Sequence, residues 1–372
     1  MLAPKFSCSR REINMKKIRT AIIGLEHIHA GSLAKDFNNY EEIEWVGMAA
    51  IPPYTEEELE KYLTKNMRKE ADIPVWDDYK ELLNQNLDLA IVCTNIRRHV
   101  EIVEETLAMG IHTVVEKPMA MTMEDARRMY RAYRRSTAHL FINWPIAWFA
   151  YFRKAKELAD SGIVGDIQRV QYRSPSTTGP FKPGDYTPEE LSKWWWYKKE
   201  EGGGSLYDYA GYGCVLTTWF TGKNAKRVSG FKKNFLLPFS DVEDYCVFTI
   251  DFGDSLGLIE GSWSTMSNGQ IPTGPIVYGS EGVIVADRYN PMVKVYKDCR
   301  TPLTSSRPTA EYTPDPCSDS LASNVIRFLQ GGEPPFEMIT PEFNMRAQAA
   351  LDAGRRSCES GQIEYAEEPL QF

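Results

Sequence analysis

Lys117 is the first residue whose type and setting point to chemistry. It lies in the run Glu116-Lys117-Pro118, directly after the apolar segment 111–115. A lysine beside a crevice can hold an alkoxide or phenolate, or orient a substrate hydroxyl, and its pKa falls when water is removed from it. The structural alternative is that Pro118 ends a strand and Lys117 is solvated.

Asp208 and Tyr212 form a second candidate pair, because their spacing places both side chains on one face of a helix. The helix opens at the glycines 202–204, where bare backbone allows close approach to a crevice or a substrate. In the alternative interpretation, Tyr212 packs in the core and Asp208 caps the helix. No histidine follows residue 139, so an acid or base from the second half must be Asp, Glu, Lys, Tyr or Cys.

The composition excludes several classes of function. With 372 residues, 42% of them hydrophobic, the chain can form two domains with separate cores. A net charge of -8 and scattered basic residues argue against nucleic-acid binding. No apolar run reaches the roughly 18 residues of a membrane span, and the N-terminus lacks the core of a secretory signal. We expect a cytoplasmic protein without a membrane partner.

The seven cysteines are widely spaced and contain no CxxC pair. This pattern favours reduced thiols over a disulfide framework or a zinc site, and we expect no metal.

Up to about residue 143, short apolar runs alternate with amphipathic stretches. Strands are predicted over 18–23, 43–50, 88–93, 111–115 and 139–143, and helices over 28–39, 55–65, 78–84, 97–109 and 122–136. This alternation is typical of a parallel sheet covered by helices on both faces.

Later residues show mainly the two-residue periodicity of strands. Strands are predicted over 167–173, 226–235, 243–252, 255–264, 273–278, 282–286 and 292–297, and helices over 147–161, from the glycines 202–204, and over 317–330 and 341–358. Successive strands with short turns indicate a largely antiparallel sheet. The predicted organisation is a leader over 1–16, with Met15 as a candidate start, a first domain over 17–142 and a second over 143–372.

Ligands of an open parallel sheet bind beyond the carboxyl ends of its strands. The first such loop, "GLEHIHAG", keeps Gly24 for a tight turn but has Glu26 and His29 where a diphosphate-binding loop has further glycines. A carboxylate beside a diphosphate costs Coulomb energy, which protonated His27 or His29 can offset. The alternative is an ordinary strand-to-helix turn.

The loop after the second strand has Ala50 where an acidic residue would bind the ribose. No Lys or Arg follows before Lys61, so nothing there favours the extra phosphate of NADP, and NAD is preferred. Thr94, Asn95 and His99 stand at the carboxyl end of the strand predicted over 88–93.

Six blocks in order resemble the Gfo/Idh/MocA family of oxidoreductases, which includes glucose–fructose oxidoreductase and inositol dehydrogenases. They are "TNIRRH", "EKPMAMTMEDA", "KELADSGIVGDI", "GGGSLYDYAGYG", "YGSEGVIVAD" and "FNMRAQAALDAGRRSCESGQ". The resemblance covers nearly the whole chain from Lys17.

The resemblance implies a Rossmann domain followed by an α+β domain whose large, mostly antiparallel open sheet mediates homodimers or homotetramers. It also implies an NAD(P) cofactor and hydride transfer at a hydroxyl-bearing carbon, with Lys117, Asp208 and Tyr212 as catalytic residues. The expected cofactor-binding residues are Gly24, Glu26, His27, Ile28, Ala50, Thr94, Asn95, His99, Glu116 and Lys117.

The chain departs from the family pattern at three positions. Tyr212 replaces the usual histidine, as in glucose–fructose oxidoreductase, Val215 replaces a second acid, and Asn143 stands where many relatives have arginine. A tyrosine base needs help because its ordinary pKa is about 10, and a nearby ammonium lowers that pKa by favouring the phenolate. We therefore predict that Lys117 and Tyr212 act as an acid/base pair while Asp208 orients the sugar.

The run "LSKWWWYKKE" offers aromatic faces for a pyranose and ammonium groups for its hydroxyls. The alternative is that its tryptophans fill the domain junction. The expected substrate-binding residues are Asn143, Trp144, Tyr172, Lys193, Trp195, Trp196, Asp208 and Tyr212.

The sequence thus predicts an NAD(P)-dependent dehydrogenase acting on a small carbohydrate, polyol or glycoside. Two alternatives stay open. One is a glycosidase that retains NAD and cleaves its substrate through transient oxidation and elimination. The other is a non-catalytic relative whose nucleotide loop has decayed. Glu26 and Ala50 favour this alternative, because they replace residues expected in a dinucleotide site.

Overall fold

The computed structural model describes residues 16–51, 72–174, 179–181, 184–265, 272–287, 290–297 and 307–370. The helix predicted over 55–65 and nearly all of the predicted leader lie outside these residues.

The first domain is built on a six-stranded parallel sheet of strand order β3-β2-β1-β4-β5-β6. Its strands are β1 Ile18–Ile23, β2 Ile43–Ala49, β3 Val75–Trp76, β4 Leu89–Val92, β5 His112–Glu116 and β6 Leu140–Asn143. The apolar runs become strands because both faces of such a sheet are buried, and every residue of β4 is buried. The prediction missed β3, which has only two residues.

The helices of this domain are α1 Ala30–Asn38, α4 Tyr79–Leu83, α5 Ile96–Ala108 and α6 Met123–Arg135. Local chemistry fixes their ends. In α6, the Thr122 hydroxyl accepts the backbone N–H of Asp125, two acidic residues occupy the first turn and two arginines the last. These charges complement the helix dipole. The Asn95 side chain caps α5 in the same way.

The second domain carries a nine-stranded sheet of order β14-β13-β12-β11-β7-β10-β9-β8-β15, antiparallel except between β7 and β10. The strands are β7 Ile167–Arg173, β8 Arg227–Lys233, β9 Tyr245–Asp251, β10 Leu256–Ser262, β11 Ile276–Gly279, β12 Val283–Asp287, β13 Asn290–Tyr296, β14 Ala310–Tyr312 and β15 Glu364–Tyr365. The α/β plus α+β architecture predicted from the sequence is confirmed. The short edge strands β14 and β15 were not predicted.

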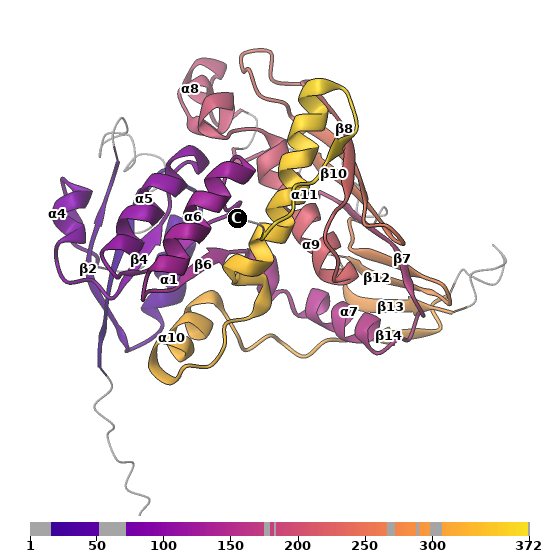
Figure 1. Ribbon diagram of the computed structural model, residues 1–372, viewed down its shortest axis with the longest axis horizontal. Helices are drawn as coiled ribbons and strands as arrows, with labels where there is room; N and C mark the ends of the chain where they lie inside the picture. Colours follow the sequence, from indigo (N-terminus) through magenta and orange to yellow (C-terminus); the bar gives the residue numbers. More distant parts are fainter. Residues whose placement is uncertain are drawn as a thin grey trace, which may run out of the picture.

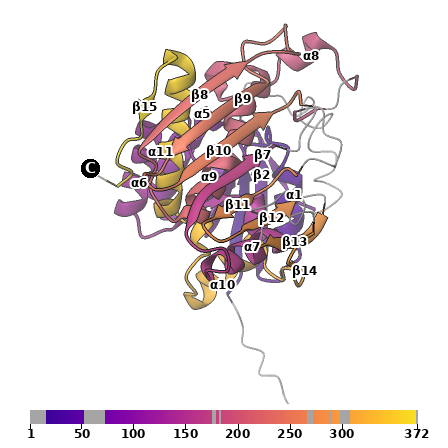
Figure 2. The ribbon, with the colours of Figure 1, turned by 90° about the vertical axis from the view of Figure 1, so that its right-hand side faces the viewer.

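Helices cover one face of the large sheet and leave the other open, and Figure 2 looks onto the open face. The second-domain helices are α7 Ala150–Asp160, α8 Pro188–Ser192, α9 Gly211–Thr221, α10 Leu321–Gly331 and α11 Pro341–Ser360. The helices α7, α9 and α11 pack on the sheet. By contrast α10 packs on α1 of the first domain, where an Asp36 carboxylate oxygen accepts the backbone N–H of Ala322.

The two domains meet along α11, which runs between them (Figure 1) and contacts α6 and β6 on one side and α9 and β8 on the other. Buried polar contacts fix this junction. The Trp144 indole donates to Asn344 Oδ1 over 2.6 Å, and the Tyr130 hydroxyl donates to Glu342 over 3.2 Å. These contacts along the domain junction therefore hold α11 in a fixed arrangement relative to the first domain.

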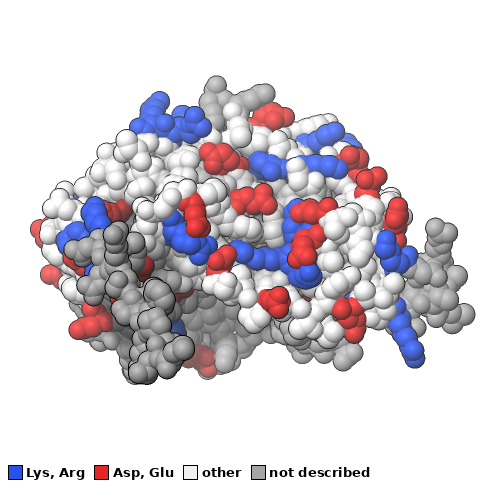
Figure 3. All heavy atoms as spheres, turned by 90° about the horizontal axis from the view of Figure 1, so that it is seen from below, with Lys and Arg blue, Asp and Glu red and all other residues white. Residues whose placement is uncertain are grey.

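The surface in Figure 3 shows acidic and basic side chains interspersed, and neither sign gathers into one continuous patch on this face. Within the described part of the chain, none of the helices combines the length and apolar character that a membrane span requires.

Replacement of Gly354 tests the packing of α11 on the sheet. A Cβ there would stand 2.4 Å from Phe248 Cε2 on β9, so Gly354→Ala should lower the free energy of unfolding by about 1–3 kcal/mol through overpacking. Urea unfolding monitored by tryptophan fluorescence measures the change. Gly331→Ala is the matched control, because a Cβ there meets nothing within 4 Å, and its expected effect is neutral or slightly stabilising. Equal losses in both variants would contradict the packing argument.

Candidate active site

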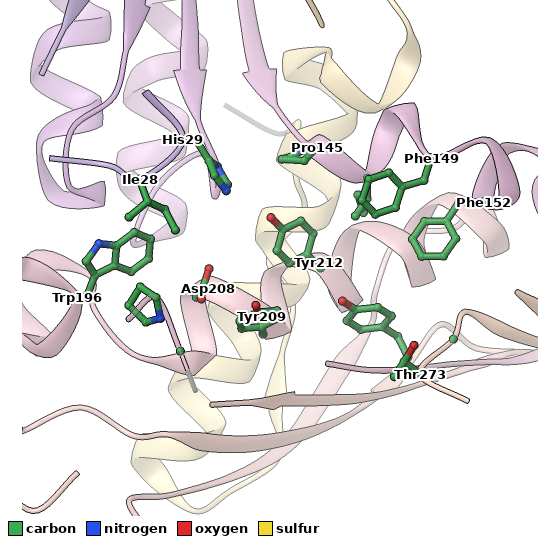
Figure 4. A pocket seen from close by; sticks show the side chains of 15 residues that line it. Ile28, His29, Pro145, Phe149, Phe152, Trp196, Asp208, Tyr209, Tyr212 and Thr273 are labelled. Carbon is green, nitrogen blue, oxygen red and sulfur yellow. The ribbon is translucent and has the colours of Figure 1, made fainter. Parts of the chain in front are cut away.

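A cavity of about 200 Å³ lies at the junction of the domains (Figure 4). Its wall combines the first loop of the Rossmann domain, the start of α7, strand β7 and the segment that leads into α9. The lining residues are Ile28, His29, Pro145, Ile146, Phe149, Phe152, Tyr172, Gly179, Pro180, Trp196, Asp208, Tyr209, Tyr212, Thr273 and Gly274.

Lys117 and Asp208 form a buried ion pair across the domain junction. Lys117 follows β5 directly, and its side chain is 2% exposed. Its Nζ lies 2.5 Å from Asp208 Oδ1 and 3.3 Å from the Asp208 carbonyl oxygen. The Trp263 indole donates to the other carboxylate oxygen over 2.8 Å. Both oxygens of Asp208 are therefore engaged by the protein.

Tyr212 completes the group. Asp208 lies in a π-helical turn, Leu206–Ala210, and Tyr212 in the first turn of α9. Lys117 Nζ stands 4.8 Å from the centroid of the Tyr212 ring, so the ammonium contacts the face of the ring. Trp144 packs edge-on against the same ring with centroids 5.4 Å apart. In Figure 4 the Tyr212 hydroxyl lies on the side of His29 and Pro145.

The Glu116 carboxylate is buried beside this group. Its Oε1 accepts from the Asn143 amide over 2.7 Å, and its Oε2 lies 3.2 Å from His29 Nδ1. Burial alone raises the pKa of Glu116, but the His29 imidazole and the hydrogen bonds from His29 and Asn143 act in the opposite direction. The net pKa is well below the usual range. One N–H of the Asn143 amide is thus engaged by Glu116, and the predicted role of Asn143 in substrate binding stays a prediction.

His27, His29 and Glu116 bring three ligand atoms within 4.8 Å of one another, an arrangement that a metal ion can use. However, His27 Nδ1 accepts the backbone N–H of His29, and burial holds the pKa of His27 well below its ordinary value. The ring is therefore neutral with its proton on Nε2, the atom that faces Glu116 at 3.8 Å. A protonated nitrogen has no lone pair for a metal, which argues against metal binding.

The first loop suits a dinucleotide despite its altered sequence. Gly24 has φ +80°, and a Cβ there would stand 2.3 Å from Thr94 Cγ2, so only glycine fits. The Glu26 carboxylate is buried, and its Oε2 accepts the N–H of Leu25 over 2.8 Å. Among the described residues no side-chain capping hydrogen bond is made by His29, the N-cap of α1, although the N–H groups of His29 and Ala30 are bonded to His27. The next N–H groups of the first turn would be the ones to bind a diphosphate.

The tryptophan run joins this loop to the second domain. Trp195, which is 1% exposed, donates its indole N–H to the Glu26 carbonyl oxygen over 2.9 Å and stacks on Trp196 with centroids 3.8 Å apart. Trp196 also packs on the His27 ring and lines the cavity. Trp195 therefore fills the domain junction, as the alternative interpretation of this run expects, whereas Trp196 faces the cavity.

The predicted site residues fall into two groups. The cavity wall includes five of them, Ile28, Tyr172, Trp196, Asp208 and Tyr212. A second group is buried behind the wall and consists of Thr94, Asn95, His99, Glu116, Lys117, Asn143, Trp144 and Trp195. Lys193 is exposed, and Ala50 follows β2 directly. The catalytic and binding roles given to these residues stay predictions.

Trp263, Phe149 at the N-cap of α7 and Phe152 within α7 were not predicted as site residues. Trp263 follows β10 and reaches Asp208 only because β10 pairs with β7 and β9 beside the π-helical turn. Phe149 and Phe152 looked like ordinary apolar positions of a helix. No pattern in the sequence distinguishes them from core residues.

Two family profiles match the chain and together cover more than half of it. The profile described as "Oxidoreductase family, NAD-binding Rossmann fold" matches residues 18–144, and that of the GFO/IDH/MocA C-terminal domain matches residues 152–285.

Among individual proteins, myo-inositol 2-dehydrogenase of Thermotoga maritima is 26% identical over 162 residues, 43% of this chain and 46% of that protein. Glycosyl hydrolase family 109 protein 3 of Phocaeicola vulgatus is 25% identical over 159 residues, 42% of this chain and 29% of that protein. The chain thus spans less than half the length of these relatives. The solved structure of aldose-aldose oxidoreductase from Caulobacter crescentus, complexed with glycerol, has the same fold, with a TM-score of 0.73 and 20% identity over 94% of this chain and 100% of that one.

Glu26 gives the site a pH dependence that can be measured. Burial raises the pKa of its carboxyl to about 7 from an ordinary value of 4.5. The folded state therefore holds the proton more tightly than the unfolded chain, and this contribution to stability is complete below pH 4.5 and lost as the pH rises through 7. The shift corresponds to about 3 kcal/mol.

Glu26→Gln should remove that contribution. Urea unfolding of the wild type and the variant at pH 4.5, 6 and 8 should show the variant gaining stability relative to the wild type as the pH rises. His112→Gln is a control for histidine titration elsewhere in the domain. A difference between the two proteins that is independent of pH would contradict the assignment.

Proposed function

Because the chain belongs to the Gfo/Idh/MocA family of NAD-binding oxidoreductases, we propose that it transfers hydride between a nicotinamide cofactor and a hydroxyl or keto carbon of a sugar, polyol or glycoside. The observation that carries the proposal is the convergence of Lys117, Asp208 and Tyr212 at the domain junction, where Asp208 and Tyr212 line the cavity and Lys117 contacts both from behind its wall. The polyol and sugar activities named for the relatives support the substrate class.

Tyr212 is the proposed base, and its hydroxyl oxygen takes the proton of the substrate hydroxyl. The Lys117 ammonium, 4.8 Å from the ring centroid, favours the phenolate that this role requires. Two of the three ammonium N–H groups serve Asp208, and the positive charge lies against the Tyr212 ring, where it would favour the oxyanion that develops as the proton is transferred. Asp208 acts as a positioning residue for Lys117, because both its oxygens already accept hydrogen bonds.

Gly24 and the N-terminus of α1 would hold the diphosphate of the cofactor, and NAD when bound supplies the acceptor for hydride. The Glu26 carboxylate bonds to the backbone of its own loop, so it does not oppose the diphosphate from the helix end. NAD is preferred to NADP, since no basic residue lies between Ala50 and Lys61.

Substitution of the base tests the proposal directly. Tyr212→Phe and Lys117→Ala should each lower kcat by about 10²–10⁴-fold, because each removes a participant in proton transfer. Rates of NAD reduction with a panel of sugars, polyols and glycosides, measured from pH 6 to 10, give the comparison. In the wild type kcat should rise with pH to a plateau, and this rise should disappear in Tyr212→Phe.

Tyr207→Phe is the matched control for this experiment. Tyr207 lies in the π-helical turn just before Tyr212, and its hydroxyl donates to the Met121 carbonyl oxygen, away from the cavity. Near-native rates in both Tyr212→Phe and Lys117→Ala would refute the pairing.

A second candidate function is the cleavage of glycosides by an NAD-retaining route, which the glycosyl hydrolase family 109 relative favours. Mass spectrometry of the purified protein distinguishes the two. A hydrolase should carry tightly held NAD and release sugar from a nitrophenyl glycoside without net reduction of added NAD. A dehydrogenase should reduce added NAD in proportion to the sugar oxidised. A chain that neither carries nor binds a dinucleotide would contradict both.

A further inference from the structure

The cavity has two chemically different ends. Near Tyr212 its wall is polar, with His29, Asp208 and Tyr209. On the side opposite Trp196 and Ile28, Figure 4 shows the rings of Phe149 and Phe152 at the wall. Ile146 and Tyr172 of β7 also line the cavity.

This far end is unsuited to a second sugar ring. Phe149, Phe152 and Ile146 have no polar side-chain atoms. The hydroxyls of Tyr172 and Thr273 are the polar side-chain groups assigned to this end, and that of Thr273 already donates to Asp287 over 2.9 Å, so it can serve a ligand only as an acceptor. Each sugar hydroxyl buried without a partner costs about 1–3 kcal/mol. A group seated there must therefore carry few hydroxyls, whereas flat apolar groups gain both burial and ring contacts.

The aromatic side chains at this end already pack on one another, and Phe149 also stacks on Tyr151 with ring centroids 5.4 Å apart. Phe149 and Phe152 lie with centroids 5.6 Å apart at a tilt of 55°, and Phe149 is only half-buried. Offset and edge-on arrangements of this kind are the preferred contacts between aromatic rings. No Lys or Arg side chain is among the described residues of the wall, so none of these residues offers a counter-ion to a phosphate or carboxylate.

We propose that the substrate is an uncharged glycoside with an aromatic aglycone, the sugar lying at Tyr212 and the aglycone against Phe149, Phe152 and Tyr172. This inference rests on the proposed function for the sugar end and adds the aglycone site. It makes Phe149 a specificity-determining residue, because its ring is the half-buried member of the pair and contacts the aglycone.

Matched glycosides test the aglycone site. Phenyl, cyclohexyl and methyl glycosides of glucose, galactose, xylose and N-acetylgalactosamine, in both anomers, are compared by KM for NAD reduction and by Kd from calorimetry. Phenyl glycosides should bind about tenfold more tightly than their methyl partners, with cyclohexyl glycosides between them. Equal binding of phenyl and methyl glycosides, or tighter binding of cyclohexyl than phenyl glycosides, would overturn the proposal.

Variants at Phe149 test its location. In Phe149→Ala the methyl-to-phenyl ratio of Kd should fall about tenfold toward one, and Phe149→Leu, which keeps apolar volume for folding, should show a smaller fall. Phe231→Ala is the matched control, because that ring is 67% exposed on β8 of the large sheet and should leave the ratio unchanged. An unchanged ratio in both Phe149 variants would place the aglycone elsewhere and overturn the assignment.

The two measurements separate the two proposals. Tight binding of phenyl glycosides without NAD reduction for any sugar would refute the dehydrogenase function and support the aglycone site. NAD reduction with equal KM for phenyl and methyl glycosides would support the function and refute the aglycone site.

Discussion

The charge of Lys117 constrains the structure more than any other single feature of the site. A buried ammonium costs several kcal/mol unless it is paired and hydrogen-bonded. Its partner, Asp208, belongs to the other domain and meets it at 2.5 Å. The ion pair therefore ties the end of β5 to the segment before α9, and the domain junction cannot open without exposing or unpairing both charges.

Neighbouring residues contact the second carboxylate oxygen of Asp208 and the ammonium of Lys117. The Trp263 indole takes the second oxygen of Asp208, and the Tyr212 ring face lies against the ammonium. Trp144 in turn packs edge-on against Tyr212 and donates to Asn344 of α11. The chemistry of the site and the packing of the domain junction thus share the same side chains, so a substitution at one affects the other.

The first loop solves a different electrostatic problem. Glu26 replaces a glycine of the usual diphosphate loop, and the fold removes its carboxylate from the helix end by burial, which raises its pKa to about 7. The Trp195 indole holds the backbone of the same residue from the second domain. The loop keeps the left-handed Gly24 turn and the uncapped start of α1, the two features a diphosphate needs.

The sequence by itself determined the elements and the class of the protein. Continuous apolar runs predicted most strands of the first sheet, because both of its faces are buried. A spacing of two residues predicted most strands of the second sheet, and spacings of three and four predicted the helices. The order of six short blocks identified the family, which the profiles confirm. The run around Lys117 and the spacing of Asp208 and Tyr212 marked the candidate site, because they are polar residues at element ends.

Only the tertiary structure decided how these residues are paired. The sequence predicted substrate contacts for Asn143 and Lys193, and the fold adds that Asn143 donates to Glu116 and that Lys193 is exposed. It gave no sign of Trp263, since a contact between residues 55 positions apart depends on sheet register and not on local pattern. Burial likewise turned Glu26 inward, because the direction of a side chain is a property of the packed loop and not of its residue type.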